Sequence, residues 1–271
     1  MALAGGVPRM RAARGPVRWA LLSDIHIPAD PANEYRGFRP FDNLKKVVPE
    51  VVAARPDGML ICGDVARLEG QPGDYENVKT LLAPAEKIAP VVFALGNHDD
   101  RENFLAAFGS GQGAQKVSGK HVVVLETAAL RLVLLDSLIQ ANVIPGLLGK
   151  EQRTWLQRFL AEADDRPTLL FVHHTLDDSD GSLADVPRFF DIVKPCRQVK
   201  AIVYGHSHRY AYDTLDGLHL INLPAVGYNF ADREPVGWVE SVLTAEGGEF
   251  TLRGLAGNLE KNGKTVSLRW R

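Results

Sequence analysis

The feature that most constrains this sequence is the stretch Val91 to Asp100, in which a short apolar run stops at a cluster of polar side chains. The residues from Val91 to Leu95 are all apolar, as expected for a β-strand that is buried on both faces. Gly96 ends the run, and four polar residues follow it at once. Strands buried on both faces belong to α/β layer structures, where ligands bind outside the strand ends. The stretch therefore predicts a functional site at a strand end.

Four other strand-like runs end in the same way: Val17 to Leu22, Gly58 to Cys62, Thr168 to Val172 and Ala201 to Tyr204. Helically spaced apolar residues separate the first runs along the chain, which predicts a βαβαβ order with parallel strands. Parallel strands present their carboxyl ends together, so the polar residues at these ends are expected to meet. These residues are Asp24 and His26, Asp64, Asn97 and His98, His173, and His206 and His208.

The donors at the five strand ends favour metal binding over packing as their role. They are carboxylate oxygens, imidazole nitrogens and one amide oxygen, and none is a thiolate. Buried together without a metal ion, such groups would be left unpaired at a cost of several kcal/mol each. This donor set suits a pair of divalent or trivalent ions such as Mn, Fe, Zn or Co. By contrast, single strand-associated histidines such as His121 and His219 are expected to be structural or surface residues.

The rest of the chain predicts one α/β domain. Residues 1–15 carry arginines without a continuous apolar segment and are expected to be a disordered leader, while residues 16–271 form a single domain. From about residue 210 the pattern changes to antiparallel strands, which favours two packed sheets. The glycines at 109–113 fit no phosphate-binding loop, and Arg209 stands where a nucleophilic Ser207 would need glycine.

Composition excludes several classes of partner. A formal net charge of -2 gives no electrostatic case for a nucleic acid polymer or an anionic membrane surface. No apolar run approaches the roughly 18 residues of a membrane span. The two cysteines, Cys62 and Cys196, lie in or beside apolar runs and predict no disulfide framework, which fits a cytoplasmic location.

The motifs in order resemble the calcineurin-like metallophosphoesterase superfamily. They are D-x-H, G-D, G-N-H-D, a histidine pair and G-H-x-H, within a match from about Val17 to Trp238. The chain looks most like the bacterial cyclic-nucleotide and glycerophosphodiester phosphodiesterase branch, because of Gly96 to Arg101, the pair Asp136-Ser137 and a helix with Trp155-Leu156. The resemblance implies a four-layer αββα sandwich of two mixed β-sheets flanked by helices.

The resemblance also implies a chemistry. A hydroxide that bridges two metal ions would attack phosphorus in line. His98 would stabilise the transition state or protonate the leaving oxygen, and Asp99 would orient the His98 ring. Arg67 would contact a phosphate oxygen, and His174 would face the substrate or support the ligands from behind. One metal ion would be held by Asp24, His26 and His208, the other by Asn97, His173 and His206, with Asp64 bridging both.

The predicted function is therefore hydrolysis of a small phosphoric ester, with a phosphodiester preferred and a homodimer expected by analogy. A phosphomonoesterase or a promiscuous phosphotriesterase stays open, because the same hydroxide attacks any of these esters. A non-catalytic metal-binding scaffold is the alternative from another class. Degenerate members of the superfamily lose ligands, whereas this chain has all seven and His98 as well.

Two departures from the family pattern lie at the rim of the predicted site. Thr175 and Leu176 follow the histidine pair where the branch often has two prolines. Val65, Ala66 and Arg67 replace the usual continuation rich in Asn or Asp. Specificity is expected to depend on the loops 27–40, 177–187 and 228–235.

Overall fold

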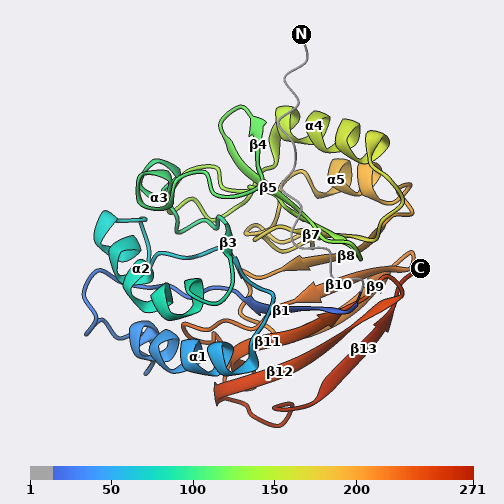
Figure 1. Cartoon of the computed structure of the whole chain (residues 1–271). Helices are drawn as coiled ribbons and strands as arrows, with labels where there is room; N and C mark the ends of the chain where they lie inside the picture. Colours follow the sequence, from blue (N-terminus) through green and yellow to red (C-terminus); the bar gives the residue numbers. More distant parts are fainter. Residues whose placement is uncertain (1–14) are drawn as a thin grey trace.

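The computed structural model describes residues 15–271 and shows two β-sheets that face each other, with helices on their outer sides (Figure 1). The predicted four-layer sandwich of two mixed sheets is confirmed. The predicted leader lies outside the described residues, apart from Gly15 at its end. Among the residues described, no helix is long and apolar enough to cross a membrane.

The first sheet contains the three strands that open the predicted βαβαβ order. Its strand order is β13-β12-β11-β1-β2-β3, and β1, β2 and β3 run parallel while β11 to β13 join antiparallel at β1. Its strands are β1 (Val17–Leu22), β2 (Gly58–Cys62), β3 (Val91–Ala94), β11 (Pro235–Leu243), β12 (Gly247–Gly257) and β13 (Thr265–Arg269), and the helices associated with it are α1 (Pro40–Ala54), α2 (Pro72–Glu86) and α3 (Arg101–Phe108).

The second sheet has the order β4-β5-β6-β7-β8-β10-β9. Its central strands β6, β7, β8 and β10 are parallel neighbours. The expected antiparallel hairpin after residue 210 forms between β9 and β10, but β10 itself pairs in parallel with β8. The elements are β4 (Ala114–Val117), β5 (Lys120–Glu126), β6 (Arg131–Leu134), β7 (Thr168–Phe171), β8 (Val199–Tyr204), β9 (Ala211–Leu215) and β10 (Leu218–Asn222), with helices α4 (Gly149–Glu162) and α5 (Val186–Val193).

Three apolar clusters fill the three spaces between the four layers. Alternate residues of a strand point to opposite faces, so Trp19 and Leu21 of β1 pack between the sheets while Ala20 and Leu22 pack against the helices. The second sheet divides its residues in the same way against α4 and α5. Burial on both faces explains why these strands are continuous apolar runs, and it fixes the positions of their polar ends.

The helices differ from the sequence expectation in a few details. A proline within a helix usually kinks or ends it, yet α1 continues through Pro49 to Ala54. Pro49 lies on the exposed side, where water can satisfy the carbonyl that loses its hydrogen bond. The apolar pattern of α2 runs on to Ile88, but the helix ends at Glu86 and Ile88 is 47% exposed. The short elements β4 and α5 were not anticipated.

Candidate metal centre

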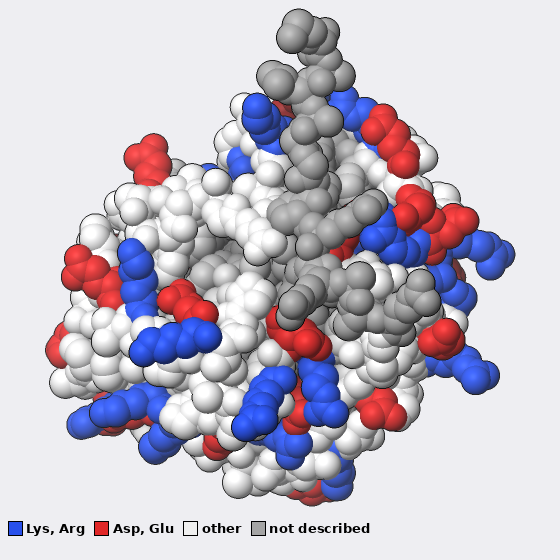
Figure 2. Space-filling view, in the orientation of Figure 1, with Lys and Arg blue, Asp and Glu red and all other residues white. Residues whose placement is uncertain are grey.

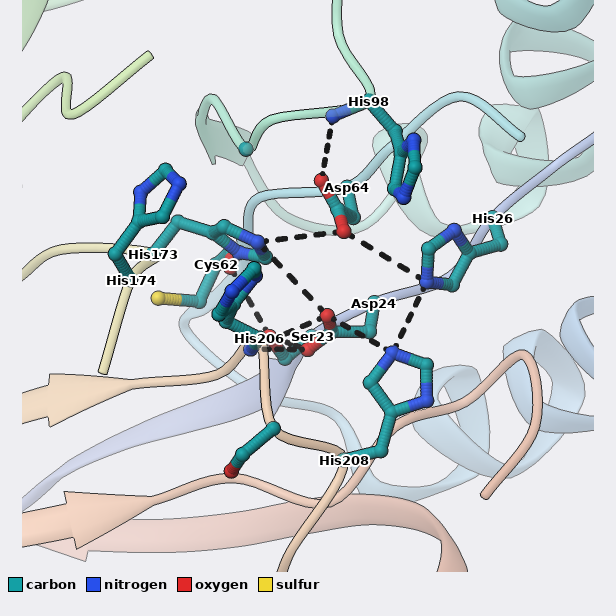
Figure 3. Close-up of polar contacts among 12 residues, drawn as sticks. Ser23, Asp24, His26, Cys62, Asp64, His98, His173, His174, His206 and His208 are labelled. Atoms are coloured by element: carbon teal, nitrogen blue, oxygen red, sulfur yellow. Dashed lines mark hydrogen bonds and ion pairs between the residues drawn. The ribbon is translucent and has the colours of Figure 1, made fainter. Parts of the chain in front are cut away.

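The predicted ligands come together where the carboxyl ends of β1, β2, β7 and β8 meet (Figure 3). Histidine and carboxylate atoms form three groups whose donor atoms lie within 4.8 Å of one another. Asp64 belongs to two of the groups, and His26 also belongs to two. The groups are Asp24, His26 and His208; His26, Asp64 and His98; and Asp64, His173 and His206.

Both carboxylates lie between histidine nitrogens. Asp64 Oδ2 lies 3.3 Å from His173 Nε2 and 3.7 Å from His26 Nε2, so it stands between the two halves of the cluster. Asp24 Oδ1 lies 3.3 Å from His208 Nε2 and 4.0 Å from His173 Nε2. These contacts are the dashed lines in Figure 3. We call the group of Asp24, His26 and His208 the first half of the cluster, and the group of Asp64, His173 and His206 the second half.

Two buried polar atoms at the centre have no hydrogen-bond partner among the described residues. They are Asn97 Oδ1 and His173 Nε2. Buried polar side-chain atoms nearly always have a partner, so each unpaired atom needs an explanation. A bound cation would satisfy both, and oxygen and imidazole donors suit ions such as Mn, Fe, Co and Zn. The residues present therefore fit the metal ions that the sequence predicts.

Backbone carbonyls orient three of the histidines from behind. His173 Nδ1 donates to Cys62 O at 2.8 Å, and His208 Nδ1 donates to Tyr228 O at 2.5 Å. His26 Nδ1 faces Arg67 O at a longer 3.4 Å. A carbonyl can only accept, so each Nδ1 carries the proton and each Nε2 presents a lone pair to the centre. This arrangement is typical of histidines that bind metals.

The backbone at the centre is held in an unusual conformation. Asp24, His26, Asp64, His206 and His208 have φ values between 47° and 68°. Non-glycine residues rarely adopt positive φ, and each such residue costs about 1–3 kcal/mol. The surrounding sheets compensate for this strain, because every one of these residues directly follows a buried strand or lies within a few residues of its end.

Glycines allow the strand ends to approach one another. A methyl group added at Gly96 would overlap the Asp64 carboxylate and lie 2.8 Å from His173 Nε2. One added at Gly63, where φ is 83°, would lie 2.7 Å from His173 Cβ. The glycines of the G-D and G-N-H-D motifs are therefore required by space as much as by backbone freedom.

The cluster gathers positive charge around its carboxylates. Burial disfavours the charged forms, but His208 and His173 outweigh it and hold the pKa of Asp24 below its usual value. Burial also opposes protonation of His173, yet Asp64 and Asp24 raise the pKa of His173 to about 9. Burial lowers the pKa of His26 to about 3. His26 is therefore neutral and both carboxylates are ionised, which are the forms that bind cations, whereas His173 would release its proton when a cation binds.

The roles expected of His98 and Asp99 are only partly compatible with their contacts. His98 lies beside the cluster, with its Nδ1 2.9 Å from Leu68 O and its backbone N–H donating to Asp64. Asp99 was expected to orient the His98 ring, and this is wrong. Its carboxylate instead accepts hydrogen bonds from the backbone N–H groups of Gly96, Val65 and Ala66 and from the Tyr75 hydroxyl. Asp99 thus joins two ligand-bearing loops to each other.

His174 also differs from the expectation of a substrate-facing residue. It is fully buried, and Ser137 Oγ and the Ile144 carbonyl engage its two ring nitrogens at 2.7 Å and 3.0 Å. With both nitrogens occupied, its ring packs on His206 at a centroid distance of 4.8 Å. His174 therefore supports a ligand from behind, which was the other role considered for it.

Aromatic residues around the first half of the centre were not identified from the sequence. Tyr228 stacks on His26 at 4.6 Å, and Phe230 stacks on His208 at 4.1 Å. The Arg67 guanidinium lies over the Tyr35 and Tyr228 rings. The loops 27–40 and 228–235 were expected to shape the rim, but no sequence pattern indicated which of their residues reach the ligands.

The sequence alone did not place the charged side chains on the surface. On the face shown in Figure 2, acidic and basic side chains are interspersed, and no extended patch of one sign is visible. The overall formal charge of -2 agrees with this distribution. Electrostatic attraction of a polyanion requires a clustered basic face.

Comparisons with known proteins agree with the geometry. A Pseudomonas aeruginosa protein named 3′,5′-cyclic adenosine monophosphate phosphodiesterase CpdA is 31% identical over 219 residues, which are 78% of this chain and 76% of that protein. A Synechococcus protein named a probable cyclic nucleotide phosphodiesterase is 29% identical over 236 residues, 84% of this chain and 88% of that protein. The crystal structure of a dimetal phosphatase from Danio rerio superposes with a TM-score of 0.74 at 15% identity, over 94% of this chain and 100% of that one.

The superposition shows the fold alone, whereas the sequence relatives also indicate the branch of the family. They confirm the resemblance to the bacterial cyclic-nucleotide phosphodiesterase branch. The profile of the family described as Calcineurin-like phosphoesterase matches residues 17–210, which include every predicted metal ligand. A phosphoesterase was the class of enzyme predicted from the motifs, and the match confirms it. The chain belongs to the calcineurin-like phosphoesterase family.

Proposed function

We propose that this chain is a phosphodiesterase that depends on two metal ions and hydrolyses cyclic nucleotides. The observation that carries the proposal is the double donor cluster that shares Asp64, with Asn97 Oδ1 left buried and unpaired beside it. A pair of metal sites that share one carboxylate suits the in-line displacement of a phosphate ester. The names of the bacterial relatives support the choice of cyclic nucleotides as substrates.

The proposed ligands divide into two sets. When bound, the metal ions would make water a nucleophile at neutral pH and would polarise the phosphoryl oxygens. Mn, Fe, Zn and Co all suit the donors, and their identity depends largely on availability. Asp24, His26 and His208 would hold one ion, Asn97, His173 and His206 the other, and Asp64 would contribute to both.

His98 is the proposed acid for the leaving oxygen. Its Nδ1 donates to the Leu68 carbonyl, so Nε2 is the nitrogen left to exchange a proton with substrate. The ring lies edge-on to His26 at 5.3 Å and is only partly buried, so it lies beside the ligands and remains open to solvent. Asp99 acts as a positioning residue, because its carboxylate fixes the backbone on either side of the cluster.

The first experiment compares bis(p-nitrophenyl) phosphate with p-nitrophenyl phosphate, using metal-free protein reconstituted with Mn. 3′,5′-Cyclic AMP is measured alongside as the natural type of diester. We expect the diester to be hydrolysed faster than the monoester and the cyclic nucleotide to be cleaved. Asn97→Ala is the control, because it removes one proposed ligand of the second ion and should abolish the diester rate.

The remaining outcomes separate the alternatives. A faster rate with the monoester would replace the phosphodiesterase by a phosphomonoesterase, and efficient cleavage of a phosphotriester would indicate a promiscuous enzyme. No hydrolysis of any ester with any of the four metals would contradict the proposal and favour a metal-binding scaffold. Metal content measured on the same samples shows whether the protein was loaded.

A further inference from the structure

Arg67 is a fixed arginine beside the metal centre whose terminal nitrogens are not used. Its Nε donates to Asn33 Oδ1 at 3.2 Å, and its guanidinium lies 4.8 Å from the Tyr35 ring centroid and 5.4 Å from that of Tyr228. No carboxylate of the described residues lies within ion-pair distance of it, although 17 such pairs occur elsewhere in this part of the chain. The two terminal nitrogens are thus oriented donors without an acceptor.

The Tyr228 ring links Arg67 to the metal ligands. It contacts the guanidinium and stacks on His26 at 4.6 Å with an interplanar angle of 26°. The backbone carbonyl of Arg67 also lies 3.4 Å from His26 Nδ1. The Tyr228 ring thus contacts both a predicted metal ligand and the Arg67 guanidinium.

Two exposed aromatic rings lie on the same side of the centre as Arg67. Tyr35 is 41% exposed and Phe230 is 48% exposed, which is unusual for large apolar side chains beside a buried cluster. Phe230 stacks on His208 at 4.1 Å, and Arg36 Nη2 donates to Phe230 O at 2.8 Å, which ties the two rim loops together. Exposed aromatic rings offer stacking surfaces to any nucleobase.

We propose that Arg67, with Tyr35 and Phe230, forms a subsite for a purine base that presents two hydrogen-bond acceptors on one edge, as guanine does. The inference rests on the proposed hydrolysis of cyclic nucleotides. Guanine presents O6 and N7, which both accept from a guanidinium, whereas adenine presents N7 beside an amino group that donates. A guanidinium has only donors, so it pairs with guanine and is opposed by adenine. Arg67 is thereby a specificity-determining residue, and a preference of about tenfold is expected.

The test compares kcat/KM for cyclic GMP, cyclic IMP and cyclic AMP on the metal-loaded full chain. Cyclic IMP keeps O6 and N7 but lacks the 2-amino group, so it isolates the edge that Arg67 would read. Arg67→Gln is the informative variant, because a glutamine amide pairs with adenine. Arg188→Gln, an exposed arginine on α5, is the matched control. Bis(p-nitrophenyl) phosphate has no base and reports the integrity of the centre.

We expect the native chain to favour cyclic GMP and cyclic IMP equally over cyclic AMP. Arg67→Gln should remove or reverse that preference, and its kcat/KM for cyclic GMP should fall by a larger factor than its rate on bis(p-nitrophenyl) phosphate. Calorimetric titration with GMP, IMP and AMP should show the same order in binding.

Three other outcomes would overturn the inference. Equal rates with all three nucleotides in the native chain would leave the proposed function intact and remove the base preference. A parallel loss of all substrates in Arg67→Gln, bis(p-nitrophenyl) phosphate included, would place Arg67 on the phosphate instead. Cleavage of bis(p-nitrophenyl) phosphate without cleavage of any cyclic nucleotide would refute the proposed substrate class, and the base subsite with it.

Discussion

Three buried carboxylates that follow strands differ in their neighbours: Asp136 lies beside permanently charged cations, whereas Asp24 and Asp64 lie beside histidines. Asp136, which follows β6, accepts hydrogen bonds from Arg101 Nε at 2.7 Å and Arg101 Nη2 at 3.0 Å and lies 3.9 Å from Lys120 Nζ. Asp24 and Asp64, equally buried, have only histidines as charged neighbours within ion-pair distance in the described part of the chain. The protein supplies the counter-charge of Asp136 itself, whereas bound metal ions would supply that of Asp24 and Asp64 under the proposed function.

The two groups also differ in how completely their hydrogen bonds are satisfied. Asp136 accepts from the backbone N–H groups of His121 and Leu138 as well, and Gln152 bonds to its backbone. The metal centre leaves Asn97 Oδ1 and His173 Nε2 without partners. Complete satisfaction is typical of a structural network, whereas each unpaired buried atom needs an explanation, and a bound cation would provide it for Asn97 and His173. Burial alone does not distinguish a structural network from a binding site.

The largest effect is expected for Asp64→Asn. The substitution keeps the shape of the side chain but removes the charge that both halves of the centre share, which represents several kcal/mol of transition-state stabilisation. Activity on bis(p-nitrophenyl) phosphate should fall roughly 1,000-fold. The melting temperature in EDTA should fall, because His173 loses the buried carboxylate that pairs with it in the metal-free centre. A variant that keeps its activity would show that Asp64 is not a shared ligand.

Asp136→Asn should lower the stability of the fold and leave the metal centre intact. Arg101 and Lys120 would lose their buried partner, and breaking such a pair typically costs about 3–5 kcal/mol. Urea unfolding should show this loss with and without metal, whereas the metal affinity of the folded protein should stay close to native. If Asp136→Asn instead lost metal while retaining stability, the distinction between the two groups would be wrong.

The sequence predicted the residues of the candidate metal centre better than those of the hydrogen-bond network around Asp136. The carboxyl ends of β1, β2 and β3 meet by the topology of one parallel sheet, so their polar residues could be placed from apolar runs. The strands β7 and β8 belong to the other sheet, and the family resemblance implied that their histidines join the same site. Asp136 was noted only as part of a motif, because its partners Arg101 and Lys120 come from distant points of the chain. The short half-exposed strand β4 lacks the alternation that marks a strand, and α5 spans barely two turns.

Asp99 shows the same limit within the centre itself. The sequence placed it next to His98 and suggested a contact between neighbours. Its actual partners are mainly backbone N–H groups, including those of Val65 and Ala66, more than thirty residues earlier. Every residue except proline has a backbone N–H group, so no sequence pattern indicates which of these groups will bind a given carboxylate. The packing of two loops, which sequence patterns do not encode, decides the role of such a carboxylate.

Asp99→Asn should have an intermediate effect. An amide keeps one acceptor oxygen but cannot accept from Gly96, Val65 and Ala66 as a carboxylate does, so the two loops would separate slightly. Residues that position ligands typically contribute about 10–100-fold to metal affinity or activity, and the lower end is expected here. Titration with Mn at fixed substrate should show weaker metal binding with kcat largely recovered at saturation. Loss of kcat at saturating Mn would assign Asp99 a direct catalytic role.

The smallest expected effect is on the pH dependence of stability, and it comes from His121, a neighbour of Asp136. Burial lowers the pKa of His121, whose backbone N–H donates to Asp136. A histidine with a lowered pKa in the folded state is protonated more readily in the unfolded chain, so stability falls as pH drops below about 6.5. His121→Gln should reduce the slope of unfolding free energy against pH between pH 7 and pH 5, measured with urea in EDTA. An unchanged slope would assign the acid sensitivity to the other histidines whose pKa values burial lowers, namely His26, His174 and His206.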